Sequence, residues 1–246
     1  MKREEILSAS SMPMFSPSYP PGPYRFIHRE YLTITYESDP EAIRAAVPEP
    51  LEPARNLVTF EWMKMPDSSG FGDYTESGQV IPCLFHGKPV SFPVQMYLND
   101  EPPITAGREI WGFPKKWGQP RLELLHDTLT GTLLYDDVMI AIGTMTYKYE
   151  SHASEPEETL NILGKPQVTL KLIPDVDGRP KIAQLVQFSM TDIAIKGSWV
   201  GQGRLHLVPH VNARVADLPV RRVIEARHMI GDMTLPYGRV VHDYLA

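Results

Sequence analysis

The sequence has almost no cysteine, no long hydrophobic run and no excess of positive charge. The single cysteine among 246 residues, Cys83, cannot form an internal disulfide, and its apolar neighbours favour a buried, unreactive thiol. No Cys/His spacing resembles a structural zinc site. No segment approaches the roughly 20 apolar residues that cross a bilayer, and acidic residues near the N-terminus argue against a signal peptide. We therefore expect a cytoplasmic protein that has no contact with a membrane.

The balance of charge also restricts the possible partners. A net charge of −6 argues against a nucleic-acid-binding or anionic-membrane-binding protein, because such proteins are usually basic. It still permits a small anionic substrate, since one local cationic pocket is enough to bind it. The hydrophobic fraction of 42% and the charged fraction of 22% are typical of a globular protein.

Proline is the residue that is present in excess. The chain contains 24 prolines, about twice the usual fraction of ~5%, and they are spread along its whole length. Proline interrupts helices and the interior of sheets, so this distribution favours many short strands joined by shaped loops.

Hydrophobic alternation predicts strands along most of the chain. A hairpin is expected from 74–85 and 89–98 around a turn at 86–88, and a short helix over 41–46 after Asp39 and Pro40. The remaining strands are expected at 25–37, 56–65, 121–126, 131–135, 138–149, 168–173 and 181–195, with a strand pair over 221–235 and either a strand or a final helical turn at 240–245. Loops are expected at 66–72, 151–158 and 197–203.

These elements predict one domain over residues 1–246, with an irregular N-terminal arm over 1–24. The fold class is mainly β (α+β), with antiparallel strands and a few short helices. With so many strands, closure into a β-barrel-like sheet would remove the exposed edges.

The candidate functional centre is the stretch from Glu109 to Gly118, which holds the adjacent lysines Lys115 and Lys116 among three aromatic residues. A buried lysine can lose its proton, and a neutral lysine is a nucleophile that forms Schiff bases. The alternative is that both side chains snorkel, with their stems on the aromatic rings and their ammonium groups in water. On an extended segment the two side chains would point to opposite faces.

Three other charged residues lie on predicted strands that can face one cavity: Arg29, Glu61 and Glu76. Alternation over 56–65 sets Val58, Phe60 and Trp62 on one face of a strand. It sets Glu61 on the other, largely apolar face. Taken singly, each of the three charged residues is better explained by a salt bridge or by exposure to solvent.

Together with the lysines, these residues resemble the acetoacetate decarboxylase family. The segment Gly107-Arg108-Glu109 through Phe113-Pro114-Lys115-Lys116-Trp117-Gly118-Gln119-Pro120 is similar to that family's lysine signature. Further similar segments follow the family's order over essentially the whole chain, at 20–24 with 28–31, at 47–51, at 74–79 and at 96–102.

The resemblance implies a β-barrel-like enzyme that forms a large homo-oligomer and converts acetoacetate, a small anionic β-keto acid, to acetone and CO2 without a cofactor. Lys115 matches the Schiff-base lysine and Lys116 its cationic neighbour. Arg29, Glu61 and Glu76 match the polar groups of the family's cavity. Phe113 and Met96 are expected to contact the substrate.

Two causes can lower the pKa of Lys115, namely burial in an apolar cavity and the charge of Lys116. Because Lys116 is expected to face away, we expect burial to be the larger cause. Two alternative functions remain open. One is an aldolase or dehydratase of the same family that forms an imine at Lys115 but releases no CO2. The other is a non-catalytic β-barrel binding protein.

Overall fold

The computed structural model describes residues 1–246 as strands with a few short helices. The strands are β1 (Tyr24–Glu37), β2 (Glu52–Pro53), β3 (Leu57–Ser68), β4 (Gly72–Phe85), β5 (Lys88–Leu98), β6 (Lys115–Trp117), β7 (Gln119–Leu125), β8 (Thr128–Tyr135), β9 (Val138–Thr146), β10 (Gln167–Pro174), β11 (Pro180–Phe188), β12 (Thr191–Gly201), β13 (Gly203–Leu207), β14 (Arg222–Leu235) and β15 (Arg239–Asp243). The helices are α1 (Arg3–Ser8), α2 (Pro40–Ala46), α3 (Glu101–Ala106), the π-helix η1 (Gly107–Trp111), the 3₁₀ turns η2 (Glu150–His152) and η3 (Val215–Asp217), and α4 (Pro156–Leu163). None of the helices is both long and apolar enough to cross a membrane.

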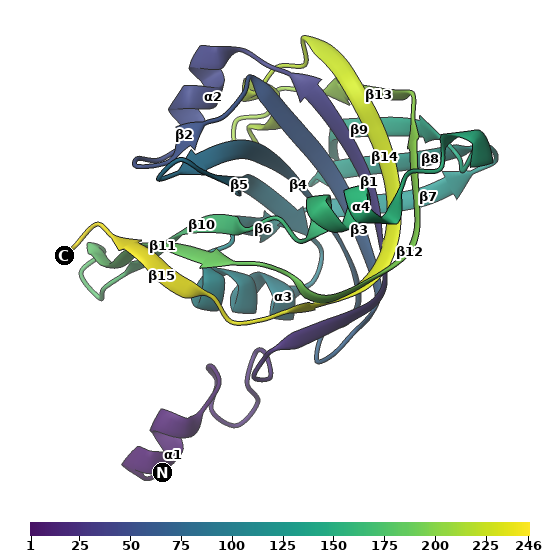
Figure 1. The fold of residues 1–246 in the computed structure, drawn as a ribbon. Coiled ribbons are helices and arrows are strands. Elements are labelled where there is room, and N and C mark those ends of the chain that lie inside the picture. Colours follow the sequence, from purple (N-terminus) through teal and green to yellow (C-terminus); the bar gives the residue numbers. More distant parts are fainter.

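The strands form two sheets (Figure 1). The larger sheet has the order β12-β14-β1-β3-β4-β5-β10-β11-β15, with β2 added beside β4 and β6 beside β5. The smaller sheet, β13-β9-β8-β7, packs against one face of β1 and β3. The expectation of a mainly β protein with short helices is confirmed.

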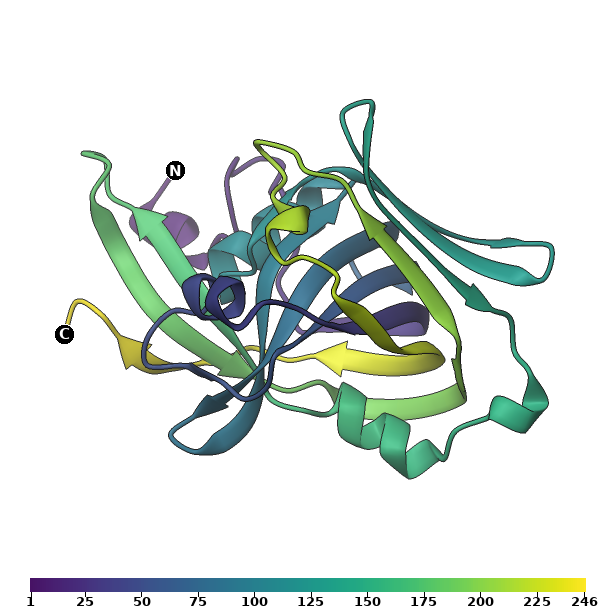
Figure 2. The ribbon, with the colours of Figure 1, turned by 90° about the horizontal axis from the view of Figure 1, so that it is seen from above.

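The expectation of a barrel is wrong, because the larger sheet stays open. Its terminal strands, β12 and β15, do not pair with each other, and β5 continues through a parallel contact to β10 and on to β11 and β15. The strands β10, β11 and β15 extend away from the smaller sheet (Figures 1 and 2). The free edge of β12 is covered by the segment that carries η2 and α4, including a bridge from Ala153 to Trp199. Closure is therefore not needed to protect that edge.

The local predictions succeed where the signal is alternation or a tight turn. The β4–β5 hairpin turns at His86 and Gly87, both with positive φ, and α2 begins at Pro40 as expected. Other segments differ from the prediction. Part of the expected loop at 151–158 belongs to α4, and 181–195 is divided between β11 and β12. The expected turn at 66–72 is present but shorter, at 69–71 between β3 and β4. The helices α3 and η1, over 101–111, have no counterpart in the prediction.

Two further segments that contain glycine also differ from the prediction. The expected loop at 197–203 is mostly strand, and the expected pair over 221–235 is the single strand β14. A Cβ on Gly197 would lie 2.3 Å from the Trp199 ring, and one on Gly231 would lie 3.0 Å from the Ala194 carbonyl oxygen. These glycines permit close packing within strands and do not mark turns.

The main core lies between the two sheets and centres on Trp62, which is fully buried on β3 and donates a hydrogen bond to the Thr132 carbonyl. Gly131 and Gly143 of the smaller sheet lie against the indole, and a Cβ added at Gly131 would be 2.3 Å from it. The opposite face of β3 carries Glu61 and Met63, as alternation predicts. That face and a second apolar cluster enclose the cavity described below.

Gly131→Ala is therefore expected to destabilise the fold by about 1–3 kcal/mol, because the added methyl overlaps the Trp62 ring. Urea denaturation monitored by tryptophan fluorescence measures this change. The double variant with Trp62→Leu should show coupling, since the smaller side chain removes the overlap. Unchanged stability of the single variant would contradict the packing described.

Candidate active site

The strand β6 separates the two lysines. It pairs in parallel with β5, so that Met96 lies opposite Lys115 and Tyr97 opposite Lys116. Alternation along β6 directs Lys115 inward, where it is 6% exposed, and Lys116 outward. The prediction that the two side chains face opposite ways is confirmed.

Lys116 is occupied outside the cavity. Its Nζ donates a hydrogen bond of 2.5 Å to the Asn212 carbonyl and lies 5.1 Å from the Tyr135 ring centroid. Trp117, the next residue, is half-exposed. The structure therefore does not bring Lys116 together with the other predicted site residues.

The π-helix η1 shapes the space around Lys115. A Cβ on Gly107 would lie 2.7 Å from Cδ and 2.9 Å from Cε of Lys115, so only glycine leaves room for the lysine arm. Arg108 donates a hydrogen bond of 3.0 Å from Nη1 to the Lys115 carbonyl oxygen. Gly112 ends η1 with a φ of 82° and packs on the Lys171 backbone, where a Cβ would be 2.4 Å away. Both conditions require glycine at position 112.

Glu76 is the direct partner of Lys115. It lies on β4, is 3% exposed, and places Oε1 2.6 Å from the Lys115 Nζ. Arg29 on β1 lies on the far side of Glu76, with Nη2 4.0 Å from Oε2. A single buried carboxylate thus lies between two buried cations.

Arg29 has a sparse set of polar partners. Its Nη2 donates to the Met63 sulfur at 2.9 Å, and its Nε has no hydrogen-bond partner. The guanidinium carbon lies 5.0 Å from the Phe26 ring centroid and 4.8 Å from that of Tyr31. Because thioethers and rings neutralise a charge poorly, Arg29 remains an effective cation inside the site.

The pKa of Lys115 is lowered from its ordinary value. Burial is the main cause, because it disfavours the ammonium form, and the positive charge of Arg29 adds to it. Glu76 opposes both by stabilising the ammonium form. The expectation that burial is the larger cause is confirmed, and the cation that faces Lys115 is Arg29.

Glu61 lies beside this group on β3. The register sets it between Gly78 of β4 and Thr33 of β1, so that its side chain points into the cavity. The pKa of Glu61 is raised to about 7, mainly by burial; the positive charge of Arg29 opposes this rise, and the nearby charge of Glu76 contributes to it. A carboxyl group with this pKa can give or take a proton near neutral pH.

A cavity of about 790 Å³ contains these groups. Phe113 and Met96 both line it, and the Phe113 ring centroid is 5.1 Å from the Lys115 Nζ. Cys83 lines it as well, and burial raises the pKa of its thiol to about 12. No group of three or more His, Cys, Asp and Glu residues is placed to hold a metal ion.

The structure thus brings Lys115, Glu76, Arg29, Glu61, Phe113 and Met96 to one cavity. Sequence reasoning missed Gly107 and Arg108, whose contacts fix the lysine. It also missed the aromatic and thioether groups around Arg29. Alternation along 25–37 could have found Tyr31 and Thr33, because they share a face with Arg29.

A buried lysine paired with a carboxylate in a largely apolar cavity of an open, mainly β fold defines a class of proteins that can present a neutral amine to a carbonyl compound. The family model for acetoacetate decarboxylase matches residues 11–245. The chain belongs to the acetoacetate decarboxylase family.

Individual relatives agree with this assignment. The chain is 54% identical to an acetoacetate decarboxylase of Chromobacterium violaceum over 246 residues, which cover 100% of this chain and 99% of the relative. A solved acetoacetate decarboxylase structure is 43% identical and superposes with a TM-score of 0.97 over 100% of both chains. The structure of the Legionella pneumophila enzyme is 46% identical, with a TM-score of 0.93 over 98% of this chain and 96% of the other.

Proposed function

We propose that this protein decarboxylates acetoacetate to acetone and CO2 through a Schiff base on Lys115. The observation that carries the proposal is the buried Lys115 amine, whose pKa is lowered by burial, placed beside Glu76 and Arg29 deep in the cavity. Family membership and the names of the full-length relatives support the same substrate.

The reaction follows from the chemistry of a neutral amine. The Lys115 Nζ attacks the ketone carbon, and loss of water gives a protonated imine. The bond to the carboxylate breaks, its electron pair moves into the imine as an electron sink, and CO2 leaves. The resulting enamine takes a proton on carbon, and water hydrolyses the imine to acetone and free Lys115.

The surrounding side chains suit the proton transfers and the binding of the anion. Glu76, 2.6 Å from the Lys115 Nζ, is placed to accept the proton that the amine loses on attack. Glu61, with a pKa of about 7, is a candidate donor of the proton that the enamine carbon takes up. Arg29 can orient Glu76 or attract the substrate carboxylate, and Phe113 and Met96 can pack on the methyl end of the substrate.

The pKa of Lys115 gives a prediction that concerns Lys116. Lys116→Ala should leave the pH dependence of imine formation at Lys115 within about 0.5 unit of wild type, because Lys116 lies on the opposite face of β6 and its charge faces water. The rate of borohydride trapping with acetone, measured from pH 5 to 9, tests this. A large upward shift of the rising limb would mean that Lys116 controls the pKa of Lys115.

Further properties belong to the same proposal. We infer a cytoplasmic, single-domain homo-oligomer that acts on small anionic β-keto acids without an organic cofactor. Large exposed apolar side chains on the N-terminal arm and the β10–β11–β15 extension, such as Phe15 and Val176, support assembly with further copies of the chain.

The function is tested by incubating the protein with acetoacetate, with and without borohydride. We expect release of acetone and CO2 and, with borohydride, a covalent adduct on the peptide that carries Lys115. An adduct without acetone would favour an aldolase or dehydratase. The absence of any adduct would favour a binding protein that does not use the lysine chemically.

A further inference from the structure

A third buried cation, Arg227, shares the cavity with Lys115 and Arg29. It lies on β14, and its side chain is 4% exposed. The register places Thr33 of β1 opposite both Arg227 and Glu61. Nothing in the proposed decarboxylation uses Arg227.

The depth of Arg227 can be read from the pairing of the strands. One cross-strand row contains Lys115, Met96, Gly78, Glu61, Thr33 and Arg227. The next row holds Val80, Thr59, Thr35 and Glu225. Neighbouring rows are two residues apart along each strand, which is a distance of about 7 Å.

The cavity opens beyond the row of Glu225. Its exposed lining residues are Ala54, Arg55, Pro89 and Ile162. The row of Arg227 is therefore one step inside the mouth. Glu76, to which the Lys115 amine reaches back, lies one row deeper still. A ligand that moves from the mouth to Glu76 and Lys115 must cross the row of Arg227.

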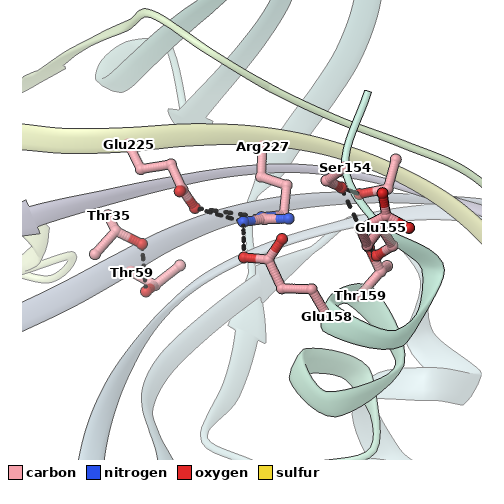
Figure 3. A network of polar contacts seen from close by, with 9 residues as sticks. Thr35, Thr59, Ser154, Glu155, Glu158, Thr159, Glu225 and Arg227 are labelled. Atoms are coloured by element: carbon pink, nitrogen blue, oxygen red, sulfur yellow. Dashed lines mark hydrogen bonds and ion pairs between the residues drawn. The ribbon is translucent and has the colours of Figure 1, made fainter. Parts of the chain in front are cut away.

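Two carboxylates occupy only part of the Arg227 guanidinium (Figure 3). Nη2 donates to Glu158 at 2.7 Å, and Nε donates to Glu225 at 3.2 Å, while Nη1 has no hydrogen-bond partner. The carboxylates are far more exposed than the cation, at 53% for Glu158 and 39% for Glu225. Either carboxylate can move into water at little cost because it is already largely exposed, whereas the buried guanidinium needs an anion in its place.

Glu158 belongs to α4, which packs on the edge strand β12 (Figure 2). Ile162 follows Glu158 by one helical turn and lines the cavity mouth. The carboxylate of Glu158 thus rests on Arg227 beside the entrance, where the carboxylate of an entering substrate would arrive.

We propose that Arg227 is an entry-binding site for the carboxylate of the substrate, and that Glu158 holds this site until the substrate displaces it. The ligand class is a small monocarboxylate β-keto acid. Its carboxylate binds the Arg227 guanidinium first and then moves deeper, to where the Lys115 amine and the Arg29 guanidinium meet Glu76. Such a local site matters because the protein as a whole carries a net charge of −6 and repels anions.

This inference rests on the proposed decarboxylation, and its test separates the two. Arg227→Gln should raise the KM for acetoacetate about 10-fold and leave kcat within about twofold, because the ionic hydrogen bond that is lost forms on entry and not at the Lys115 amine where the reaction occurs. Trapping of neutral acetone at Lys115 by borohydride should keep its wild-type concentration dependence. Glu158→Gln, at an exposed position, should lower the KM for acetoacetate by removing the competing anion.

Arg55→Gln is the matched control, because Arg55 also lines the mouth but is exposed. We expect its KM within about twofold of wild type in 0.15 M salt, where exposed charges are screened. An equal rise in KM for Arg55→Gln would show that the general positive charge at the mouth, and not a specific site at Arg227, attracts the substrate. That result would overturn the proposal. The proposal would also be overturned if Arg227→Gln weakened the apparent affinity for acetoacetate and for acetone equally, or if Glu158→Gln left the KM for acetoacetate unchanged. A wild-type protein that traps neither compound would instead refute the Schiff-base function itself.

Discussion

Replacing Lys115 by alanine should lower the rate of acetone formation by at least ~10⁴-fold and abolish the borohydride adduct, because the reaction then has no nucleophile to form the imine. The fold should persist. The lysine is buried at a cost that alanine removes, and Glu76 keeps the buried Arg29 as a cationic partner after Lys115 is lost. Mass spectrometry of the trapped protein and an acetone assay give the two readouts.

The control for this loss is Lys116→Ala, which changes the neighbouring residue on the outer face of β6. It should retain the adduct and most of the activity. If Lys115→Ala kept an adduct at another lysine together with acetone release, the assignment of the nucleophile to Lys115 would be wrong.

Glu76→Gln should have the second largest effect. It leaves Lys115 and Arg29 buried without their shared carboxylate, and breaking a buried ion pair from one side costs about 3–5 kcal/mol of stability. Because Glu76 holds the pKa of Lys115 up, that pKa should fall further in the variant. The pH at which the rate of borohydride trapping rises should therefore move to a lower value. Decarboxylation should slow, because the proton acceptor is missing.

The sign of the stability change with pH also follows from the lowered pKa of Lys115. Between its folded pKa and its ordinary value near 10.5, the unfolded chain binds more protons at this residue than the folded one. Lys115 therefore costs stability at low pH, and the cost disappears as the pH rises through this window. The loss of unfolding free energy in Glu76→Gln relative to wild type should be largest at acid pH and should decrease toward pH 10.

Urea denaturation at several pH values measures this trend. Glu37→Gln, which removes a surface carboxylate paired with the exposed Arg222, serves as the control and should show little change. If Glu76→Gln had wild-type stability and an unchanged pH dependence of borohydride trapping, Glu76 would not stabilise the ammonium form of Lys115.

Much of the site followed from local sequence signals. The opposite orientation of Lys115 and Lys116 follows from alternation in an extended segment, and so does the inward face of Glu61 on β3. The hairpin that carries Glu76 followed from two alternating runs around a short turn. Such features depend on a few neighbouring residues, and for that reason the sequence could predict them.

Other parts depend on contacts between distant segments. The helix η1 is absent from the prediction, because its glycine at 107 is selected by the Lys115 side chain and the one at 112 by Lys171. Gly197 and Gly231 lie in segments predicted as a loop and as a strand pair, but both belong to continuous strands where tight packing excludes a Cβ. The prediction of a barrel was wrong for a related reason, since the sequence shows how many strands form but not which strands pair at the edges.

The sequence by itself determined the family, the mainly β character of the fold and the separation of the two adjacent lysines. Only the tertiary structure decided that the sheet stays open, that Glu76 lies between Lys115 and Arg29, and that Arg227 enters the same cavity. The direction in which a side chain leaves a strand is a local property of the extended backbone. The partner it meets is set by long-range strand register, which brings positions 29, 76, 115 and 227 to one cavity.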